Sequence, residues 1–591
     1  MSLFTDALVR SAAGDAGMTT GTADSAVRVS WRDVHGRAVA MSAVLADRGV
    51  RPGSAVAVLA ATPADIAPAA QAVWLAGGSV TMLHQPTART DMAGYLRETA
   101  AVLRVIDARW VIVGAPFDAA AEVLAGAGIT VLTIADLDAG TVAASASASA
   151  SASASAAAAA AAAESGPGSA PGHVPGTVAA EAAESATALL QLTSGSTAMP
   201  KAVRITHANL WANIEAMCAT ADLRAGRDVM VSWLPLFHDM GMVGFLTLPM
   251  CRGLELVKVT PTDFLRSPLL WPKLISEHGG TCTAAPNFAY AIIARALAKA
   301  ADLDLSSLRF ALNGAEPIDV PAAEAFLAAG ARFGLPDTAM VPAYGMAEAS
   351  LGVSFHPWGT PLKVDTVDAD ALENGRKAVP STASGADNST ADITDSTVGA
   401  TVRRFPVLGP PLPGIEVVVK DQEGALLGDR EVGVLHLRGD SVTEEYLTVD
   451  GPKSTRGADG WLNTGDLGYL VDGEVVVCGR VKDVIIMGGR NIHPTDIERA
   501  AQSVDGVRAG NAAAVRWATS GGRESFAIVV ESREAADEAA AQRISSEVRS
   551  TVTSMIGARP ALVKVVPVGT LPKTPSGKIK RTATADLLSS T

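Results

Sequence analysis

A loop of small hydroxyl-bearing and glycine residues lies between an apolar segment and a lysine. It reads Gln191-Leu192-Thr193-Ser194-Gly195-Ser196-Thr197-Ala198-Met199-Pro200-Lys201, and the apolar run before it starts at Ala188. The backbone N–H groups and hydroxyls of such a loop can surround an anion, and Lys201 adds a positive charge. It is not a Walker A loop, which needs two spaced glycines and a Ser or Thr directly after the lysine. Taken alone, the segment is better explained as a polar turn after a strand.

Two carboxylates stand in contexts that suit a nucleotide. Glu348 ends the segment Tyr344-Gly345-Met346-Ala347-Glu348, and hard carboxylate oxygens of this kind suit Mg²⁺ on a nucleotide. Asp466 lies within Trp461-Leu462-Asn463-Thr464-Gly465-Asp466-Leu467-Gly468-Tyr469. An aspartate on a tight turn can accept hydrogen bonds from both hydroxyls of a ribose. These two positions are therefore candidates for metal and ribose contacts.

Other segments have an ordinary explanation beside a chemical one. His238 and Asp239 lie in the apolar segment Trp233 to Gly241, where a lone histidine is more often structural than catalytic. Leu312 to Pro317 is a polar turn after a predicted strand. Leu571 to Arg581 is a basic loop near the C-terminus. Its ordinary explanation is a solvated basic tail without a chemical role.

Composition limits the classes of partner. The chain has 591 residues, 48% of them apolar, and a formal net charge of −13, so we expect an acidic globular protein with two or more domains. This charge argues against nucleic acid and anionic membranes as primary partners, and an anion such as ATP needs a local positive site. Four cysteines without metal-binding spacing indicate buried residues in a reducing compartment: Cys218, Cys251, Cys282 and Cys478.

No segment has the features of an export signal or a membrane span. The residues from Met1 to Asp6 lack a basic region followed by an apolar core. The longest apolar stretch, Val229 to Met250, contains Pro235, His238 and Asp239, which are costly at a bilayer centre. We therefore expect a cytoplasmic protein in which this stretch forms a buried loop and helix.

The elements that must position these residues alternate between strand and helix. Ala55–Ala60, Ser79–Leu83 and Trp110–Val113 are predicted strands, and Ala64–Ala76 is a predicted helix, a pattern typical of parallel α/β layers. Thr206 is expected to cap a helix that begins near His207. Two polar, low-complexity segments interrupt the pattern, a predicted disordered insertion at 143–175 and a surface loop at about 382–397.

From Gly414 onward the predicted strands are shorter, and Asp472-Gly473 is a hairpin signal. The segment Cys478-Gly479-Arg480-Val481-Lys482-Asp483 lies where the pattern changes to a compact α+β region. We therefore expect a large domain over 1–480 and a small one over 481–591.

The order of the motifs is more specific than any one of them. Hydroxyl loop, Tyr-Gly-x-x-Glu, Thr-Gly-Asp, Gly-Arg-x-Lys-Asp and Pro-Ser-Gly-Lys together resemble the adenylate-forming superfamily of acyl and aryl ligases and adenylation domains. The resemblance covers roughly 30–581. It implies an α/β fold with two layered subdomains, a distorted β-barrel and a small mobile α+β C-terminal domain.

Within that superfamily the chain is most similar to fatty acyl-AMP ligases, which load acyl carrier proteins. The similar stretches are Leu234–Gly241, Ala285–Tyr290 and Gly489–Glu498. An additional segment at about 355–405 also matches that group, in which it is thought to hinder the domain rotation that CoA chemistry requires. The resemblance implies a fatty acid substrate, ATP, Mg²⁺ and a carrier protein, or a polyketide or nonribosomal synthase carrier domain, as acceptor.

The resemblance also implies roles for individual residues. Lys578 bridges the carboxylate and the α-phosphate, His238 gates the acyl tunnel, and Lys482 is the hinge. Glu348 and Thr197 hold Mg²⁺, and Asp466 with Arg480 binds the ribose. The phosphates are held by Thr193, Ser194, Gly195, Ser196, Thr197 and Lys201. The adenine pocket is formed by Asn313, Gly314, Ala315, Glu316, Tyr344, Gly345 and Met346.

The hydroxyl loop departs from the family pattern at two positions, and three alternative functions remain open. Ala198 and Ala202 stand where relatives often have glycine, which narrows the backbone conformations of the loop. The nearest alternative is a fatty acyl-CoA ligase. An amino-acid adenylation enzyme would need an acidic partner for the substrate ammonium, for which Asp239 is the candidate. A catalytically silent nucleotide-binding protein is disfavoured because Glu348, Asp466, Arg480 and Lys578 are all present.

Overall fold

The computed structural model describes most of the chain. The described residues are 1–22, 25–86, 90–126, 128–139, 183–193, 200–381, 402–487, 490–518, 524–573 and 579–589. The predicted insertion at 143–175 and the Ser/Thr-rich segment at 382–397 lie outside them. The chain divides into unit 1, which comprises Met1–Cys282, Ala347–Leu351 and Thr443–Thr455, and unit 2, which comprises the remainder. The predicted boundary between 480 and 481 lies inside unit 2 and stays a prediction.

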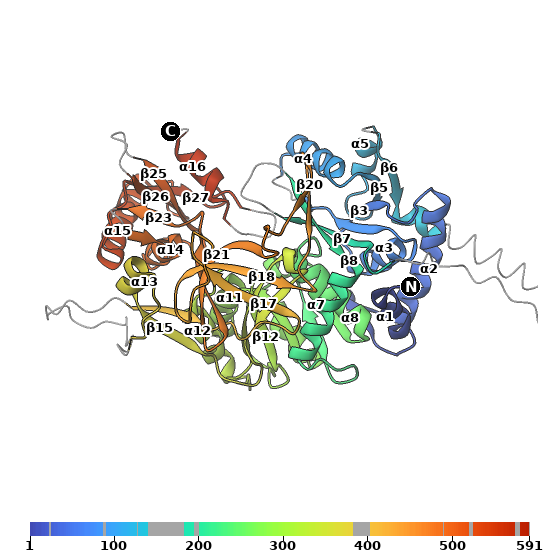
Figure 1. The fold of residues 1–591 in the computed structure, drawn as a ribbon, viewed down its shortest axis with the longest axis horizontal. Coiled ribbons are helices and arrows are strands. Elements are labelled where there is room, and N and C mark those ends of the chain that lie inside the picture. Colours follow the sequence, from blue (N-terminus) through green and yellow to red (C-terminus); the bar gives the residue numbers. More distant parts are fainter. Residues whose placement is uncertain are drawn as a thin grey trace, which may run out of the picture. The chain divides into compact units, whose positions relative to one another are not determined.

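The strands that carry the hydroxyl loop belong to an eight-stranded sheet of unit 1 (Figure 1). Strands β7, β4, β3, β5 and β6 pair in parallel, as the strand–helix alternation predicts. Strands β7, β8, β19 and β20 pair antiparallel. In spatial order the strands are β20 (Gly451–Ser454), β19 (Glu445–Thr448), β8 (Lys201–Thr206), β7 (Thr187–Thr193), β4 (Ser79–Met82), β3 (Ala55–Leu59), β5 (Ala108–Val113) and β6 (Thr130–Thr133).

Unit 1 contains further strands and the helices that pack on them. The strands, in spatial order, are β9 (Val229–Ser232), β10 (Glu255–Lys258), β1 (Gly17–Thr20) and β2 (Val27–Ser30). The helices are α1 (Leu3–Ser11), α2 (Trp31–Asp47), α3 (Pro63–Leu75), α4 (Met92–Val105), α5 (Ala120–Gly126), α7 (His207–Thr220), the π-helix η2 (Met240–Thr247), α8 (Leu248–Arg252), α9 (Pro261–Arg266), α10 (Leu270–His278) and the short 3₁₀ turn η3 (Ala347–Ala349).

Two local predictions in unit 1 have different outcomes. Thr206 caps α7 as expected, because its hydroxyl accepts from the N–H of Asn209, whose side chain in turn bonds the Thr206 N–H. The stretch Val229 to Met250 was expected to be loop and helix. It instead begins with strand β9, because its first residues pair in parallel with β10, and only then continues into η2 and α8.

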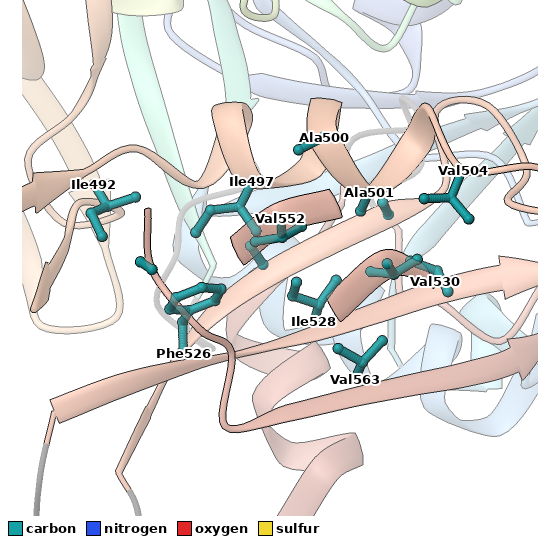
Figure 2. Close-up of a cluster of buried hydrophobic side chains, with 14 of the residues drawn as sticks. Ile492, Ile497, Ala500, Ala501, Val504, Phe526, Ile528, Val530, Val552 and Val563 are labelled. Atoms are coloured by element: carbon teal, nitrogen blue, oxygen red, sulfur yellow. The ribbon is translucent and has the colours of Figure 1, made fainter. Parts of the chain in front are cut away.

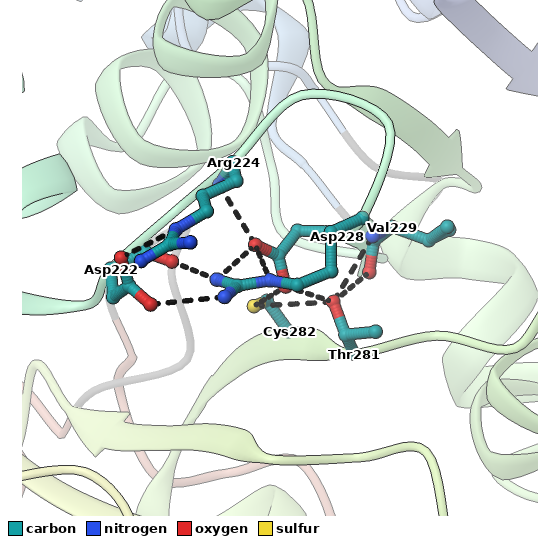
Figure 3. Close-up of polar contacts among 7 residues, drawn as sticks. Asp222, Arg224, Asp228, Val229, Thr281 and Cys282 are labelled. Carbon is teal, nitrogen blue, oxygen red and sulfur yellow. Dashed lines mark hydrogen bonds and ion pairs between the residues drawn. The ribbon is translucent and has the colours of Figure 1, made fainter.

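A network of charged residues fixes the start of β9 (Figure 3). The side chain of Asp228 is fully buried and accepts from the Arg224 N–H at 2.8 Å, from the Arg227 guanidinium at 2.8 Å and from the Thr281 hydroxyl at 2.9 Å. Asp222 pairs with both arginines, at 2.8 and 2.9 Å. A buried carboxylate is stable when hydrogen bonds and charges surround it in this way. The network therefore anchors the strand that leads into the segment with His238.

Unit 2 contains three groups of strands outside its C-terminal part. The first follows the order β11 (Cys282–Pro286, which begins at the unit boundary), β12 (Phe310–Gly314), β13 (Met340–Gly345) and β14 (Gly352–Phe355). The second is β17 (Ile415–Lys420), β18 (Gly433–Gly439), β21 (Leu462–Val471) and β22 (Glu474–Arg480), and the third is β15 (Val364–Asp368) with β16 (Val402–Pro406). The helices are α11 (Asn287–Leu297), α12 (Val320–Ala331) and α13 (Ala369–Gly375). Asp472 and Gly473 form the predicted hairpin turn of β21 and β22, both with positive φ.

The C-terminal part of unit 2 is the predicted α+β region. It comprises β23 (Ile485–Met487), β24 (Arg490–Ile492), α14 (Pro494–Gln502), β25 (Ala512–Ala518), β26 (Glu524–Ser532), α15 (Glu538–Ile556), β27 (Leu562–Pro567) and α16 (Arg581–Ser589). Phe526, Ile528 and Val530 of β26 pack with Ile497 and neighbouring residues in one core (Figure 2), while Ala527 and Val529 face a second cluster. Because β26 is buried on both faces, its sequence is a continuous apolar run.

Within the described ranges, no helix combines the length and the apolar character that a membrane crossing requires. All four cysteines are free and buried, as expected. Burial raises the pKa of Cys218 and of Cys478 to about 12, so both remain thiols.

Candidate active site

The two ends of the hydroxyl loop lie on neighbouring strands of unit 1. Thr193 ends β7, Lys201 begins β8, and the two residues are opposite each other in the antiparallel pair. The Thr193 hydroxyl is buried and has no hydrogen-bond partner among the described residues. The predicted phosphate-binding residues Ser194, Gly195, Ser196 and Thr197 lie outside the described residues. The strand pairing therefore fixes where the loop begins and ends.

Lys201, Glu348 and Tyr446 form a group in which each side chain contacts the other two. The Lys201 ammonium lies 3.6 Å from Oε1 of Glu348, and the Tyr446 hydroxyl donates to the same oxygen at 2.7 Å. The ammonium also lies over the Tyr446 ring, 4.0 Å from its centroid. Burial, and next the neighbouring Glu348 carboxylate, raise the pKa of Tyr446 far above its usual value, so its hydroxyl stays a donor.

Strand pairing explains why these three side chains meet. Tyr446 of β19 is opposite Val203 of β8, so it lies diagonal to Lys201 on the same face of the sheet. The Thr443 N–H donates to the Glu348 carbonyl at 2.8 Å, which ties the segment before β19 to η3. The sheet thus assembles residues that are far apart in the sequence.

His238 lies in a segment that is fixed against the end of β7. The Gln191 amide donates to the carbonyls of Leu192 at 3.1 Å and Phe237 at 3.0 Å. Nδ1 of His238 lies 2.6 Å from Oδ1 of Asp239. Gly241 is required there, because a Cβ would lie 2.1 Å from the Pro235 carbonyl oxygen. The structure brings His238 to the same strand end as the hydroxyl loop, but shows no contact of it with Lys201 or Glu348 among the described side chains.

A buried lysine lies beneath this segment. Lys258 of β10 is 1% exposed, and its ammonium donates to the Leu234 carbonyl, with the Ser232 hydroxyl and the Val259 carbonyl each at 3.4 Å. Burial lowers the pKa of Lys258 to about 7. Nothing in the sequence distinguishes this residue, because a lysine in a strand is usually solvated.

Asp466, Arg480 and Tyr344 form a corresponding group in unit 2. Arg480 donates from Nε to Oδ1 of Asp466 at 2.9 Å, and the Tyr344 hydroxyl donates to Oδ2 at 2.7 Å. Asp466 and Arg480 are opposite each other in β21 and β22, and the Thr464 hydroxyl accepts from the Asp466 N–H at 3.0 Å. The structure therefore brings both residues predicted for the ribose together with one of those predicted for adenine.

The turn after β12 contains the other predicted adenine contacts. Oδ1 of Asn313 is fully buried and accepts no hydrogen bond from any described residue, whereas its amide donates to Asn287 at 3.2 Å. Ala315 has a positive φ of 67°, and a Cβ on Gly314 would lie 3.1 Å from the Ala343 carbonyl oxygen. Glu316 accepts from the Phe288 N–H at 2.7 Å. The unsatisfied Asn313 acceptor matches an exocyclic amine such as that of adenine.

Four predicted residues remain to be placed: Gly345, Met346, Lys482 and Lys578. Gly345 ends β13 at an irregularity in its pairing with β14, and the Tyr344 hydroxyl lies 3.8 Å from the Met346 sulfur. Lys482 lies in the turn between β22 and β23. Lys578 lies outside the described residues, although Arg581, just beyond it, pairs with Glu498 and Asp483 at 2.9 and 3.0 Å.

The described part of the predicted 355–405 insertion contacts the C-terminal region within unit 2. Glu373 of α13 is buried and pairs with Arg403 at 2.7 Å and with Arg490 at 2.9 Å. Arg403 also pairs with Asp496 at 2.7 Å, and the Asn491 amide donates to the Glu373 carbonyl at 3.1 Å. Breaking a buried pair of this kind is costly because it leaves one charge unpaired.

The oxygen ligands available near Lys201 fit a magnesium ion that is bound to a nucleotide better than a metal that is held by protein side chains alone. Across the residues that the structure describes, no three His, Cys, Asp or Glu side chains form a metal cluster. Glu348 supplies one carboxylate, and Mg²⁺ commonly takes one or two carboxylates while phosphates and waters complete its shell. The residues present therefore fit Mg²⁺ brought by ATP.

Sequence reasoning missed Tyr446, Asn287 and Lys258. Tyr446 lies in none of the motifs described above, and only the β8–β19 register reveals its contact with Glu348. Asn287 lies in a stretch noted for its family resemblance, but its bond to Asn313 depends on the pairing of separate elements. A tyrosine that contacts Lys201 from a neighbouring strand can be recognised only when the strand order and register are known.

Comparisons with known proteins point to one family of enzymes. The model of the family described as AMP-binding enzyme matches residues 9–447. A protein of Mycobacterium tuberculosis named as ligase Rv1013 is 48% identical over 593 residues, which is 100% of each chain. The medium-chain-fatty-acid–[acyl-carrier-protein] ligase JamA of Moorena producens is 35% identical over 417 residues, which is 67% of each chain. The residues that the family model matches include the hydroxyl loop and Glu348.

Solved structures show the same fold. A structure from a study of fatty acyl-adenylate ligases from E. coli and L. pneumophila superimposes with a TM-score of 0.83 and 29% identity, covering 100% of this chain and 98% of the other. A structure of McyG A-PCP complexed with phenylalanyl-adenylate has a TM-score of 0.79 at 23% identity, covering 99% of this chain and 83% of the other. The predicted α/β fold is confirmed.

Proposed function

The chain belongs to the AMP-binding enzyme family, and on this basis we propose that it converts a fatty acid and ATP into acyl-AMP and pyrophosphate. The observation that carries the proposal is the grouping of Lys201 with Glu348 and of Asp466 with Arg480. One group pairs a cation with a carboxylate beside the hydroxyl loop, and the other offers a carboxylate to hydroxyls. Enzymes of this family use ATP, and both groups suit it.

The reaction joins two anions, so charge neutralisation and positioning dominate the chemistry. The fatty carboxylate attacks the α-phosphorus, a new acyl–phosphate bond forms, and the bond to the pyrophosphate oxygen breaks. In the proposal Lys201 and the hydroxyl loop hold the β- and γ-phosphates, and Lys578 stabilises charge at the α-phosphate. Mg²⁺, when bound at Glu348, would neutralise phosphate charge.

We propose a carrier protein as the acceptor of the acyl group. Two observations support it: the relative JamA is named as an acyl-carrier-protein ligase, and Glu373 joins the insertion to the C-terminal region through Arg403 and Arg490. Such pairing resists rotation of the C-terminal region, and CoA chemistry in this superfamily is expected to need that rotation. Lys482 is the proposed hinge.

An amino acid is a weaker candidate for the substrate. It would need a carboxylate for the substrate ammonium, and Asp239 is the residue that sequence suggests. Oδ1 of Asp239 already lies 2.6 Å from His238 and accepts from the Met240 N–H at 2.7 Å. This carboxylate is therefore engaged in holding its own segment.

A fatty-acid panel tests the proposal. Purified enzyme with ATP and Mg²⁺ is scored for pyrophosphate release and for acyl-AMP by mass spectrometry, and then for transfer to holo-carrier protein or to CoA. We expect acyl-AMP from fatty acids and acyl-carrier product without acyl-CoA. Absence of acyl-AMP from every fatty acid contradicts the activity, whereas efficient acyl-CoA formation contradicts only the acceptor.

A further inference from the structure

Tyr446 contacts both Glu348 and Lys201 at the proposed phosphate site of unit 1, although none of the motifs described above includes it. We propose that Tyr446 is a positioning residue for metal-bound ATP, whose hydroxyl holds Glu348 and whose ring holds Lys201. The inference rests on the proposed adenylate formation, because it assigns Tyr446 a task within that reaction.

The described contacts of the Glu348 carboxylate with Tyr446 and Lys201 all involve one of its two oxygens. The Tyr446 hydroxyl and the Lys201 ammonium both approach Oε1 of Glu348, at 2.7 and 3.6 Å. Among the described residues, none donates a hydrogen bond to Oε2. The carboxylate is thus held through one oxygen while the other remains available to a divalent cation, which prefers hard oxygen ligands.

In the proposal, Glu348 loses part of its contact with Lys201 when that lysine binds phosphate. An ammonium paired with a carboxylate cannot be fully used by an anionic ligand, so nucleotide binding must weaken the Lys201–Glu348 contact. The hydroxyl of Tyr446 does not depend on the lysine and continues to fix the carboxylate. Its ring face, 4.0 Å from the ammonium, gives Lys201 a second favourable contact that does not neutralise its charge.

Backbone pairing of β19 with β8 fixes the position of Tyr446 independently of its contacts with Lys201 and Glu348. Tyr446 lies in the middle of β19, which pairs with β8 from Glu445↔Arg204 to Thr448↔Lys201. The Arg204 side chain also approaches Glu445 at 3.8 Å. The Thr443 N–H binds the Glu348 carbonyl at 2.8 Å, so the same segment holds η3 by its main chain. A rigid strand is a suitable support for a group that must orient a ligand.

The chain offers a matched control. Tyr469 donates to Oδ2 of Asp365 at 2.7 Å, and Arg430 pairs with the same carboxylate at 3.0 Å. This is the same combination of tyrosine, carboxylate and cation, and Tyr469→Phe removes the same kind of hydrogen bond. None of its members is assigned to the nucleotide.

The test measures metal affinity directly. Binding of Mn²⁺ to the enzyme with a non-hydrolysable ATP analogue is followed by electron paramagnetic resonance, beside the Mg²⁺ dependence of pyrophosphate release. We expect Tyr446→Phe to raise the half-saturating Mn²⁺ and Mg²⁺ concentrations about tenfold, because it removes a hydrogen bond to a charged group. Tyr469→Phe should change them by less than about twofold.

A second variant separates the ring from the hydroxyl. Tyr446→Leu should lose metal affinity as Tyr446→Phe does and, in addition, weaken binding of the metal-free analogue about threefold, because the cation–π contact is lost. Unchanged metal affinity in Tyr446→Phe, or equal losses in Tyr469→Phe, overturns the inference while leaving the proposed function intact. A wild-type enzyme that binds no metal–nucleotide complex overturns both.

Discussion

The Tyr446 group of unit 1 and the Tyr344 group of unit 2 contain the same three kinds of side chain but use them differently. In the first, tyrosine and lysine both approach a single oxygen of Glu348. In the second, tyrosine and arginine bind different oxygens of Asp466. A carboxylate held through one oxygen can accept a cation on the other, whereas one held through both is fixed in orientation and can accept hydroxyl donors with its remaining lone pairs.

The two cations, Lys201 and Arg480, differ in a way that supports the same division of roles. Lys201 is a point charge on a flexible stem and lies against an aromatic ring, so it can move toward phosphate. Arg480 presents a planar guanidinium whose Nε binds Asp466 across the β21–β22 pair. The unit 1 group is therefore suited to exchange of partners, and the unit 2 group to a fixed geometry.

The substitution with the largest expected effect on activity is at Lys578, which belongs to neither group. Neither group is assigned to the α-phosphate, and the proposal gives that charge to Lys578. Lys578→Ala should lower the rate of acyl-AMP formation about a thousandfold, because it removes a preorganised charge from the transition state. ATP binding, measured by calorimetry, should change little.

Lys580→Ala is the control for this variant, since it removes a nearby lysine that no role requires. An Lys578→Ala enzyme with the turnover of the wild type would mean that one of the two groups described above supplies the charge at the reacting phosphorus.

Exchanging each carboxylate for its amide tests the comparison itself. Glu348→Gln should lower kcat about a hundredfold and raise the Mg²⁺ requirement, because a neutral amide binds Mg²⁺ weakly. Asp466→Asn should act mainly on the KM for ATP, because it removes an acceptor for ribose while the reacting atoms remain held. Steady-state kinetics at varied ATP and varied Mg²⁺ separate the two patterns. Identical patterns for the two variants would contradict the division of roles.

Buried histidines provide a pH test of each unit. Burial lowers the pKa of His207 in unit 1 and of His493 in unit 2 to about 4, against an ordinary value near 6.5. Each therefore binds a proton more readily when unfolded, and stability is lost as pH falls from about 6.5 toward 4. Between pH 7 and 5 each should lower the free energy of unfolding by about 2 kcal/mol.

Urea denaturation at both pH values measures this loss in the wild type and in His207→Gln and His493→Gln. Each variant should show a smaller pH dependence than the wild type. His207 bonds the Ser2 hydroxyl at 2.8 Å, so His207→Gln also reports whether α1 stays docked. A pH dependence that neither substitution changes would assign the acid sensitivity to other groups.

Local patterns predicted local structure well. Thr206 ahead of α7, the strand–helix alternation around β3 and the Asp472-Gly473 turn are each encoded within a few residues, so the sequence was sufficient for them. The motifs singled out Lys201, Glu348, Asp466 and Arg480, which the structure brings together in two pairs, and their roles toward a nucleotide stay predictions.

Long-range contacts were not predictable in the same way. Tyr446 reaches Glu348 only because β19 pairs with β8, and Lys258 is buried only because β10 lies between two parallel neighbours. Strand order and register depend on the whole sheet, and a single tyrosine or lysine in an alternating segment carries no signal of its partner.

Among the substitutions compared here, Tyr344→Phe is expected to have the smallest effect on ATP binding. Tyr344→Phe removes a hydroxyl that donates to Asp466 at 2.7 Å, just as Tyr446→Phe removes one from Glu348. Because Arg480 still holds the other oxygen of Asp466, the carboxylate should keep its orientation, and the KM for ATP should rise only about threefold. The Mg²⁺ requirement should stay that of the wild type, since the proposal assigns Asp466 to ribose. A shift in Mg²⁺ dependence as large as that of Tyr446→Phe would mean that the two tyrosines support one common function, and that holding one carboxylate oxygen rather than two has no bearing on metal binding.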